Sequence, residues 1–214
     1  MGAKKIFIYG AGGFAREVAW LASTLGIEVV AFVDDDPKAH GEIVNGIPVK
    51  ALEEIPSLYP EASAVIAVGS PRLRQELAEK VRALGLNFQT LIHPSVERSK
   101  FLEIGVGTVI AAGSILTTNI HLGNHVQINL DCTVGHDVVM SDYVTLAPGV
   151  HISGWVHLGK RVYLGTGAVV INGSADAPLV IDDDVVVGAG AVVTKSLPRG
   201  VTAVGVPAKP LRRG

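Results

Sequence analysis

One short segment of this chain carries side chains suited to proton transfer. In Gly135-His136-Asp137 a histidine stands two positions after the aliphatic Val134 and directly before an acid. A histidine can take up or release a proton near neutrality, because its ordinary pKa lies within the physiological range. Among the seven histidines, His136 is therefore the best candidate for a general base. The competing interpretation is a solvated turn residue.

A second segment could bind an anion. Gly10-Ala11-Gly12-Gly13-Phe14-Ala15 fits the pattern G-x-G-x-x-A between an apolar run at 5–9 and a helical pattern at 14–25. The free N–H groups at the start of such a helix face an anion. Asp34 ends the next apolar run, where an acid commonly binds a ribose hydroxyl. The residues assigned to this expected nucleotide pocket are Gly10, Gly12, Gly13, Phe14, Asp34, Asp35, Gly69 and Ser70.

Residues 1–92 have the alternating pattern of a small Rossmann-like α/β domain. Apolar runs at 5–9, 29–33 and 64–68 and helical segments at 14–25 and 72–84 predict a parallel sheet with helices on it. About three strands make only one mononucleotide-binding half, whereas a complete dinucleotide fold needs two. The diphosphate of a nucleotide-linked sugar is therefore favoured over NAD as the ligand of the glycine loop.

From residue 93 onward a period of six replaces the helical spacing. An aliphatic residue recurs at every step, and the residue after it is usually small. This period is typical of a parallel β-helix, in which each unit forms a flat side and a turn. Residues 93–214 are therefore predicted to be all-β, with Cys132 as a core residue in a second inward row. The first row contains Ile104, Ile110, Leu116, Leu122, Ile128, Val134, Met140, Leu146, Ile152, Leu158, Leu164 and Val170.

The period breaks after Val170 and resumes at Ile181. The gap contains a loop by composition, 172–180, with glycine, serine, aspartate and proline. A loop that leaves a regular solenoid often covers a site. A tolerated surface insertion is the alternative, and the sequence does not separate the two.

The bulk composition excludes several classes of protein. With 48% hydrophobic residues among 214, the chain can form packed cores. The formal charge of -2 argues against a nucleic-acid partner. A single cysteine allows no intrachain disulfide. No run approaches the roughly 20 apolar residues of a membrane span, and the N-terminus lacks a signal-peptide pattern. A cytoplasmic protein without membrane partners is expected.

Three further features resemble one known family. They are the histidine within a repeat at 134–137, Val-Gly-Ala-Gly-Ala-Val-Val at 187–193, and Val-Gly-Val-Pro-Ala-Lys at 204–209. Together with the period of six they resemble the hexapeptide-repeat acyltransferases, whose solenoid is a left-handed β-helix. The glycine loop and Phe32-Val33-Asp34-Asp35 resemble the subfamily that acetylates sugars for bacterial surface glycans. Members that bind a UDP-sugar often carry a histidine where this chain has Phe14.

The resemblance implies an acetyl-CoA-dependent acetyltransferase with sites between the subunits of a homotrimer. It implies that His136 is the general base and that Asp137 orients and polarises the imidazole. No metal is expected, because no spacing among the other outward histidines matches a ligand motif. Those histidines, His121, His125, His151 and His157, are interpreted as surface or subunit-contact residues. The residues expected at acetyl-CoA are Asn129, Gly154, Thr166, Gly188, Ala189 and Lys209, and Arg212 and Arg213 could meet the CoA phosphates.

Three functions remain open on the sequence alone. The favoured one is N-acetylation of a nucleotide-linked 4-amino-6-deoxy sugar. A sugar O-acetyltransferase of the sialic acid type would use the same base for a hydroxyl, so the motifs do not separate the two. A non-catalytic nucleotide-binding scaffold fits the glycine loop but leaves His136 without a role. The sequence does not name the sugar or choose among UDP, GDP and dTDP.

Overall fold

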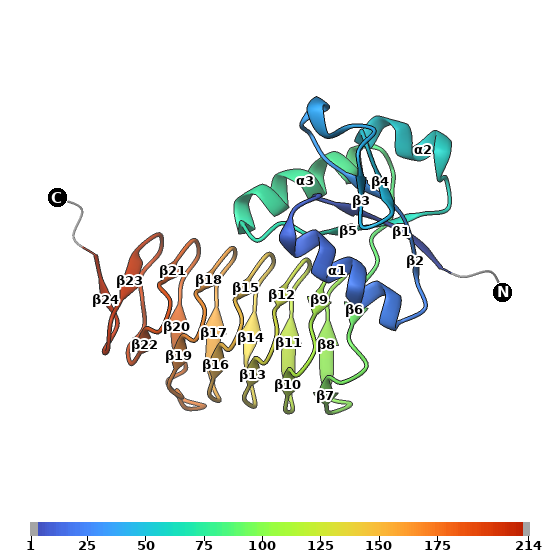
Figure 1. The fold of residues 1–214 in the computed structure, drawn as a ribbon. Helices are drawn as coiled ribbons and strands as arrows, with labels where there is room; N and C mark the ends of the chain where they lie inside the picture. Colours follow the sequence, from blue (N-terminus) through green and yellow to red (C-terminus); the bar gives the residue numbers. More distant parts are fainter. Residues whose placement is uncertain (1–3, 212–214) are drawn as a thin grey trace. The chain divides into compact units, whose positions relative to one another are not determined.

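The computed structural model describes residues 4–211 and separates the chain into two compact units. The division lies between Pro94 and Ser95. The first unit is an α/β domain and the second is a solenoid of short strands (Figure 1).

The first unit contains a five-stranded sheet in the order β3-β4-β2-β1-β5. Neighbouring strands are parallel except for the pair β3 and β4. The strands of this sheet are β1 (Lys5–Tyr9), β2 (Glu28–Val33), β3 (Ile43–Val44), β4 (Ile47–Lys50) and β5 (Ser63–Ile66). The short strand β6 (Leu91–Ile92) lies in the same stretch of chain but does not belong to this sheet. The helices are α1 (Gly13–Thr24), α2 (Ile55–Leu58) and α3 (Pro71–Ala83), with 3-10 turns at Pro37–Ala39 and Leu52–Glu54.

The core of this unit follows from its apolar runs. Ile6, Phe7 and Ile8 of β1 are all fully buried, as expected for a parallel strand that is covered on both faces. Helix α3 begins as predicted, because the Ser70 hydroxyl accepts a hydrogen bond from the N–H of Leu73 at 3.4 Å. The predicted strands and helices are confirmed, with ends that differ by one or two residues.

The hairpin of β3 and β4 is absent from the sequence prediction. It turns at Asn45 and Gly46, which both have positive φ, 49° and 82°. Asn-Gly is the favoured pair for a two-residue hairpin turn. The signal was therefore present, but the flanking strands are too short to be recognised by alternation.

The second unit is a parallel β-helix with three faces. Each coil contributes one short strand to each face. Strands on neighbouring coils pair in parallel, and before the loop at 172–180 the paired residues are 18 positions apart, as from Ile115 to Thr133 to His151. Face 1 contains β7 (Glu97–Arg98), β10 (Ile115–Leu116), β13 (Thr133–Val134), β16 (His151–Ile152), β19 (Val169–Val170) and β22 (Val192–Val193). Face 2 contains β8 (Leu102–Ile104), β11 (Ile120–Leu122), β14 (Val139–Met140), β17 (Val156–Leu158) and β20 (Leu179–Ile181).

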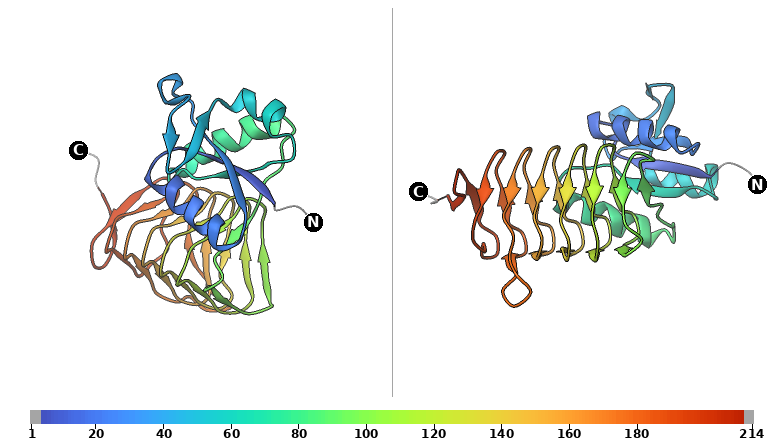
Figure 2. Two further views of the ribbon diagram at one scale, coloured as in Figure 1. Left: turned by 45° about the vertical axis from the view of Figure 1, so that its right-hand side comes forward. Right: turned by 90° about the horizontal axis from the view of Figure 1, so that it is seen from below.

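Within this unit, face 3 contains β9 (Val109–Ile110), β12 (Gln127–Ile128), β15 (Thr145–Leu146), β18 (Tyr163–Leu164), β21 (Val186–Val187) and β23 (Thr202–Val204). The final strand β24 (Lys209–Pro210) pairs antiparallel with β23. The turns between the faces are named corner 1–2, corner 2–3 and corner 3–1 below. Both views in Figure 2 show the coils of the β-helix stacked on one another along its axis.

The two predicted apolar rows form the core of the β-helix. Every member of the first row from Ile110 to Val170 is buried, and Ile104, in the first coil, is half-buried. The second row is fully buried from Val126 to Val162, including Cys132. Burial of the Cys132 thiol raises its pKa to about 11, so the core interpretation is supported over a nucleophile.

The corners require residues that tolerate a left-handed backbone. At corner 1–2 the residues Asn119, Asp137 and Trp155 have φ of 54°, 57° and 57°. Asn and Asp adopt this conformation more readily than other side chains, whereas a tryptophan there is unusual and strained. Strain of this kind often marks a functional position.

The interruption of the period forms a loop between β19 and β20. Because β19 lies on face 1 and β20 on face 2, the loop leaves the solenoid at corner 1–2. It projects well beyond the other turns of the solenoid in the right-hand view of Figure 2. The backbone N–H groups of Gly173 and Leu179 donate to the carbonyls of Gly154 and Trp155, so both ends of the loop are tied to the coil before it.

Candidate active site

His136 and Asp137 form a hydrogen-bonded pair at corner 1–2. The His136 Nδ1 atom lies 2.7 Å from Oδ2 of Asp137. An ionised carboxylate can only accept, so Nδ1 carries the hydrogen and Nε2 of the neutral ring keeps a free lone pair. The His136 side chain is 56% exposed and that of Asp137 is 23% exposed. The pair therefore presents a proton acceptor to solvent with the arrangement of a base and its orienting acid.

Gly154 makes room for the imidazole ring. It lies one coil beyond His136 in the same column of corner 1–2. A Cβ atom built on Gly154 would stand 2.5 Å from Cε1 and 2.6 Å from Nε2 of His136. Only a glycine allows the ring to lie against the backbone of the next coil. Gly154, assigned from the sequence to acetyl-CoA, is thus also a residue that positions the histidine.

Two further residues complete the surroundings of the pair. The Asn119 amide donates to Oδ1 of Asp137 at 3.2 Å, so that both carboxylate oxygens have partners. The Trp155 ring stands edge-on to the His136 ring, with centroids 6.2 Å apart. Neither residue was singled out from the sequence. Both lie one 18-residue step from Asp137, and a search at three times the six-residue period would have found them.

The other residues assigned to acetyl-CoA lie at corner 3–1 or beyond. Asn129 and Thr166 are turn residues on the far edge of face 1 from His136, and Gly188 and Ala189 belong to the same corner three coils past Asn129. Lys209 lies on the exposed strand β24. Arg212 and Arg213 lie outside the described residues. Asn129 lies seven positions before His136. In this fold seven positions span one face, so the two residues lie at different corners.

The backbone and amide groups of these residues are partly committed. The Asn129 amide donates to the carbonyl of Leu146 at 2.7 Å. The N–H of Gly188 donates to the carbonyl of Ala203 at 2.9 Å, so this N–H already has an acceptor within the solenoid. The reason is the pairing of each coil with the next one, which consumes strand-end N–H groups. The N–H of Ala189 has no backbone acceptor within the described part of the chain.

The glycine loop of the first unit borders a small pocket of about 120 Å³. Gly10, Asp34 and Asp35 line it together with apolar residues, whereas Gly12, Gly13 and Phe14 lie in the first turn of α1 outside the lining. Gly69 and Ser70 lead into α3 and also lie outside it. Gly10 has a φ of 112°, and a Cβ there would lie 2.9 Å from the carbonyl oxygen of Ala67. The lining residues are Tyr9, Gly10, Val33, Asp34, Asp35, Val68, Leu73 and Leu77.

Asp35 is the best-anchored acid of this pocket. The Tyr9 hydroxyl donates to its Oδ1 at 2.5 Å and Lys80 Nζ lies 2.6 Å from its Oδ2. Burial alone would raise the pKa of Asp35, but the hydrogen bonds from Lys80 and Tyr9 outweigh it and hold the pKa below its ordinary value. Burial and the Asp35 hydrogen bond together raise the pKa of Tyr9. Asp35 is therefore ionised near neutrality, and neither Tyr9 nor Lys80 was identified from the sequence.

One expectation about the other histidines is wrong. His125 was interpreted as an outward surface residue, but its side chain is fully buried. It lies at corner 2–3, where its ring stacks on Tyr143 with centroids 5.1 Å apart and planes within 3°. A left-handed φ of 55° turns the residue against the neighbouring coil, which a six-residue pattern does not reveal.

Residues 4–211 contain no group of three or more His, Cys, Asp or Glu side chains placed to hold a metal ion. In the same range no helix has the length and apolar character needed to cross a membrane.

Comparison with known proteins identifies the family. Residues 5–81 match the model of the PglD N-terminal domain. The chain is 32% identical over 213 residues to GDP-perosamine N-acetyltransferase of Escherichia coli O157:H7, and the alignment covers 96% of each protein.

The chain belongs to the hexapeptide-repeat nucleotide-sugar N-acetyltransferases.

Solved structures of this N-acetyltransferase family agree with the fold. Perosamine N-acetyltransferase from Caulobacter crescentus, with one histidine replaced by asparagine and with CoA and GDP-perosamine bound, has a TM-score of 0.90 and 35% identity, covering 100% of this chain and 98% of that one. The acetyltransferase domain of PglB from Neisseria gonorrhoeae, in complex with acetyl coenzyme A, has a TM-score of 0.87 and 35% identity, covering 98% and 100%. The predicted fold, a small α/β domain followed by a left-handed parallel β-helix, is confirmed. So is the prediction of an acetyltransferase.

Proposed function

We propose that this N-acetyltransferase transfers the acetyl group of acetyl-CoA to the amino group of a nucleotide-linked 4-amino-6-deoxy sugar. The observation that carries the proposal is the His136–Asp137 pair, whose 2.7 Å contact leaves Nε2 free at an exposed corner of the β-helix. The relatives named for GDP-perosamine and the structures with CoA or acetyl coenzyme A support the choice of both substrates.

His136 acts as the general base in the proposed reaction. The sugar amine attacks the thioester carbonyl carbon, a C–N bond forms and a tetrahedral oxyanion results. His136 Nε2 takes the proton that the nitrogen loses, and Asp137 stabilises the imidazolium that forms. Collapse of the intermediate breaks the C–S bond, and the proton passes from the ring to the departing CoA sulfur. No residue needs to form a covalent intermediate.

The two units have separate roles in this proposal. The first unit binds the nucleotide through the glycine loop and the acids Asp34 and Asp35. The second unit binds acetyl-CoA along the coils that contain Gly154, Thr166 and Ala189.

Gly12→Asp should weaken nucleotide-sugar binding, because a carboxylate at the start of α1 repels a diphosphate. Calorimetry should show unchanged acetyl-CoA binding, and an equal loss for both ligands would refute the division.

The active form is proposed to be a homotrimer with the sites between subunits. Hydrophobic side chains are exposed on face 1 and face 2 of the β-helix, among them Ile115, Val139 and Val180. Exposed hydrophobic side chains on neighbouring faces indicate a surface that is buried against another chain. In soluble oligomers with closed symmetry, the other subunits bury such surfaces.

The test is an assay for free CoA thiol with acetyl-CoA and a panel of nucleotide-linked sugars that carry either an amine or only hydroxyls. His136→Ala should lower kcat by roughly 10²–10⁴-fold, the usual contribution of a general base. Its affinity for acetyl-CoA should hardly change, just as the Caulobacter variant with a replaced histidine holds both CoA and GDP-perosamine. His157→Ala, at a half-buried outward position of β17, is the matched control. Turnover by the His136 variant at the wild-type rate would refute the mechanism.

A further inference from the structure

Trp155 stands against the imidazole of the proposed base in a backbone conformation that tryptophan rarely adopts. Its φ of 57° lies in the left-handed region, where Cβ crowds the backbone. A residue in this conformation persists only where the surrounding structure holds it there. The indole ring is edge-on to the His136 ring, with centroids 6.2 Å apart and planes at 83°. This geometry is one of the favourable arrangements of two aromatic rings.

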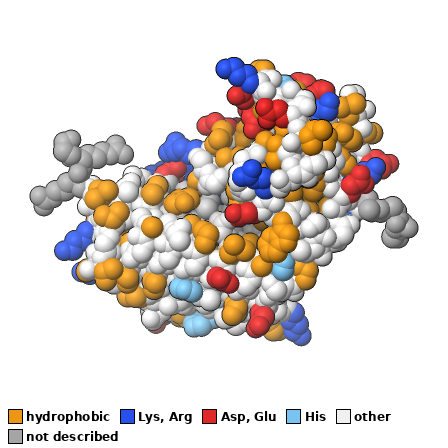
Figure 3. All heavy atoms as spheres, in the orientation of Figure 1, with side chains coloured by type: hydrophobic (Ala, Val, Ile, Leu, Met, Phe, Trp, Pro, Cys, Tyr) orange, Lys and Arg blue, Asp and Glu red, His pale blue; other side chains and the backbone are white. Residues whose placement is uncertain are grey.

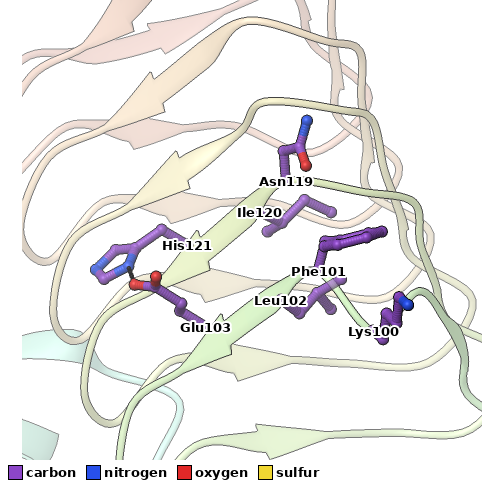
Figure 4. Close-up of a pocket in the computed structure, with 7 residues that line it drawn as sticks. All are labelled: Lys100, Phe101, Leu102, Glu103, Asn119, Ile120 and His121. Carbon is purple, nitrogen blue, oxygen red and sulfur yellow. Dashed lines mark hydrogen bonds and ion pairs between the residues drawn. The ribbon is translucent and has the colours of Figure 1, made fainter.

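The corner itself does not require an aromatic residue at this position. In the coil before, the equivalent residue is Asp137, and one coil earlier it is Asn119, with φ of 57° and 54°. Asn and Asp adopt such angles readily. The first two coils contribute Asn119 and Phe101, which lie directly before β11 and β8 and line a pocket of about 440 Å³ (Figure 4). The turn therefore explains Asn119 and Asp137 but does not explain a tryptophan.

Backbone contacts hold Trp155 in its strained conformation. Its N–H donates to the carbonyl of His136 at 3.0 Å, and its carbonyl accepts from the N–H of Leu179 at 3.0 Å. Leu179 is the first residue of β20, at the end of the loop. At the beginning of the loop, a Cβ built on Gly173 would stand 2.5 Å from the Trp155 carbonyl oxygen. The base of the loop thus fixes the direction in which the indole leaves the corner.

Histidines on the flat faces of the β-helix have partners on the neighbouring strand. His121 Nδ1 lies 2.8 Å from Oε2 of Glu103, and His151 Nδ1 lies 2.9 Å from the Thr133 hydroxyl. Figure 3 shows histidine side chains beside hydrophobic ones on the surface of the β-helix. At a corner the chain turns away from the flat strands, so His136 depends on the turn residues of the coils around it.

Three neighbours define the position of the His136 ring at the corner. Asp137 binds Nδ1 at 2.7 Å, and Gly154 leaves room for the ring against the backbone of the next coil. These two contacts alone let the ring swing toward solvent, because the side chain is 56% exposed. The Trp155 edge contact is the third. Three contacts fix a planar ring that two contacts leave able to rotate, so Nε2 keeps one direction.

We propose that Trp155 is a positioning residue that holds the His136 imidazole in the orientation used for catalysis. The inference rests on the proposed function, in which His136 takes the proton of the attacking amine, and adds to it the residue that aims Nε2. It also gives a reason for a strained tryptophan where an asparagine would turn the chain more easily. The indole acts through the imidazole and does not bind either substrate.

The experiment compares Trp155→Asn, which fits the left-handed backbone and removes the ring, with Trp155→Phe, which keeps a ring at the same place. Steady-state kinetics are measured by thiol release with the acceptor identified in the panel. Trp155→Asn should lower kcat by roughly twofold to tenfold, the effect of one aromatic pair, with KM for both substrates unchanged. Trp155→Phe should restore most of kcat. The control is Trp20→Ala, which removes the other tryptophan, 51% exposed on α1 and beside His93, and should behave as the wild type.

A double variant decides whether the indole acts through the histidine. In a background of His136→Ala, Trp155→Asn should not lower kcat further. Thermal melting checks that the variants fold, and Trp155→Leu, which keeps apolar bulk without a ring, takes the place of Trp155→Asn if that variant does not fold.

The outcomes separate the role of Trp155 from the function. If the wild type turns over an amino sugar and the variant without the ring does so with an unchanged kcat, the positioning role is refuted and the proposed function stands. An equal loss of kcat in both backgrounds, or a rise in KM for either substrate, would also refute it, because the indole would then act on the substrate or the fold. If the wild type releases no thiol with any amino sugar in the panel, the proposed function fails and the positioning role fails with it.

Discussion

Replacing Gly154 by alanine is expected to abolish most of the activity without unfolding the protein. The added Cβ would lie 2.5–2.9 Å from three atoms of the His136 imidazole. Ordinary contact begins near 3.4 Å, so the ring must move by about 1 Å. A displacement of that size breaks the 2.7 Å contact with Asp137 and commonly lowers the rate of an oriented reaction about 10²-fold.

The effect on stability should be much smaller than the effect on rate. The three atoms nearest to the new methyl group all belong to the His136 ring and none belongs to the backbone. Because the His136 side chain is 56% exposed, the ring can swing into solvent instead of displacing the coil. Gly154 does not have a positive φ, so alanine is tolerated by the backbone. A melting temperature within about 4 °C of the wild type is expected, which corresponds to about 1 kcal/mol or less.

The assay is kcat from thiol release at saturating concentrations of both substrates, with Ser153→Ala as a control that changes the adjacent residue without adding an atom. In a background of His136→Ala, the change at Gly154 should have no further effect, because the displaced ring is already absent. A Gly154→Ala enzyme with wild-type kcat would show that the ring position seen here is not the one used in catalysis. If Gly154→Ala lowered kcat by the same factor in the His136→Ala background as in the wild type, Gly154 would act on the substrate instead of on the histidine.

Four other predictions concern Asp137, Asn119, Asp35 and the oligomeric state. Asp137→Asn should lower kcat by about tenfold, which is a smaller loss than for His136→Ala. Asn119→Gly should lower kcat at saturating acceptor by roughly twofold to tenfold without changing KM for acetyl-CoA. Both effects are measured by thiol release. The folded chain holds the pKa of Asp35 below its ordinary value. Its stabilising effect is therefore present above the ordinary carboxyl pKa of about 4 and is lost as the pH falls through the folded value. Asp35→Asn should reduce the free energy of unfolding by less than about 1 kcal/mol at pH 7 and by less still at pH 3, as measured by urea titration. Light scattering at micromolar concentration should give three times the chain mass of 22.3 kDa, and a stable monomer would contradict the trimer.

The sequence by itself predicted the division of the chain, the type of each half and the candidate for the base. The period of six predicted the β-helix because every sixth side chain must enter the same narrow core, and the buried rows from Ile110 onward confirm it. Ser70 and Pro71 set the start of α3, beside the predicted helical segment at 72–84, because both act locally, through a cap and a fixed φ. His136 and Asp137 are neighbours in sequence, so their hydrogen bond could be inferred without a fold.

Only the tertiary structure decided which residues from other coils surround that pair. Asn119 and Gly154 meet His136 and Asp137 because pairing between coils brings together residues 18 positions apart. The same stacking provides a hydrogen-bond acceptor for the N–H of Gly188 and buries His125. The local sequence pattern could not predict either outcome. A pocket of about 440 Å³ lined by residues 100–103 and 119–121 also requires two coils, since no single segment contains its walls. Contacts along the sequence follow from local geometry, whereas contacts across coils depend on a register that only the folded solenoid supplies.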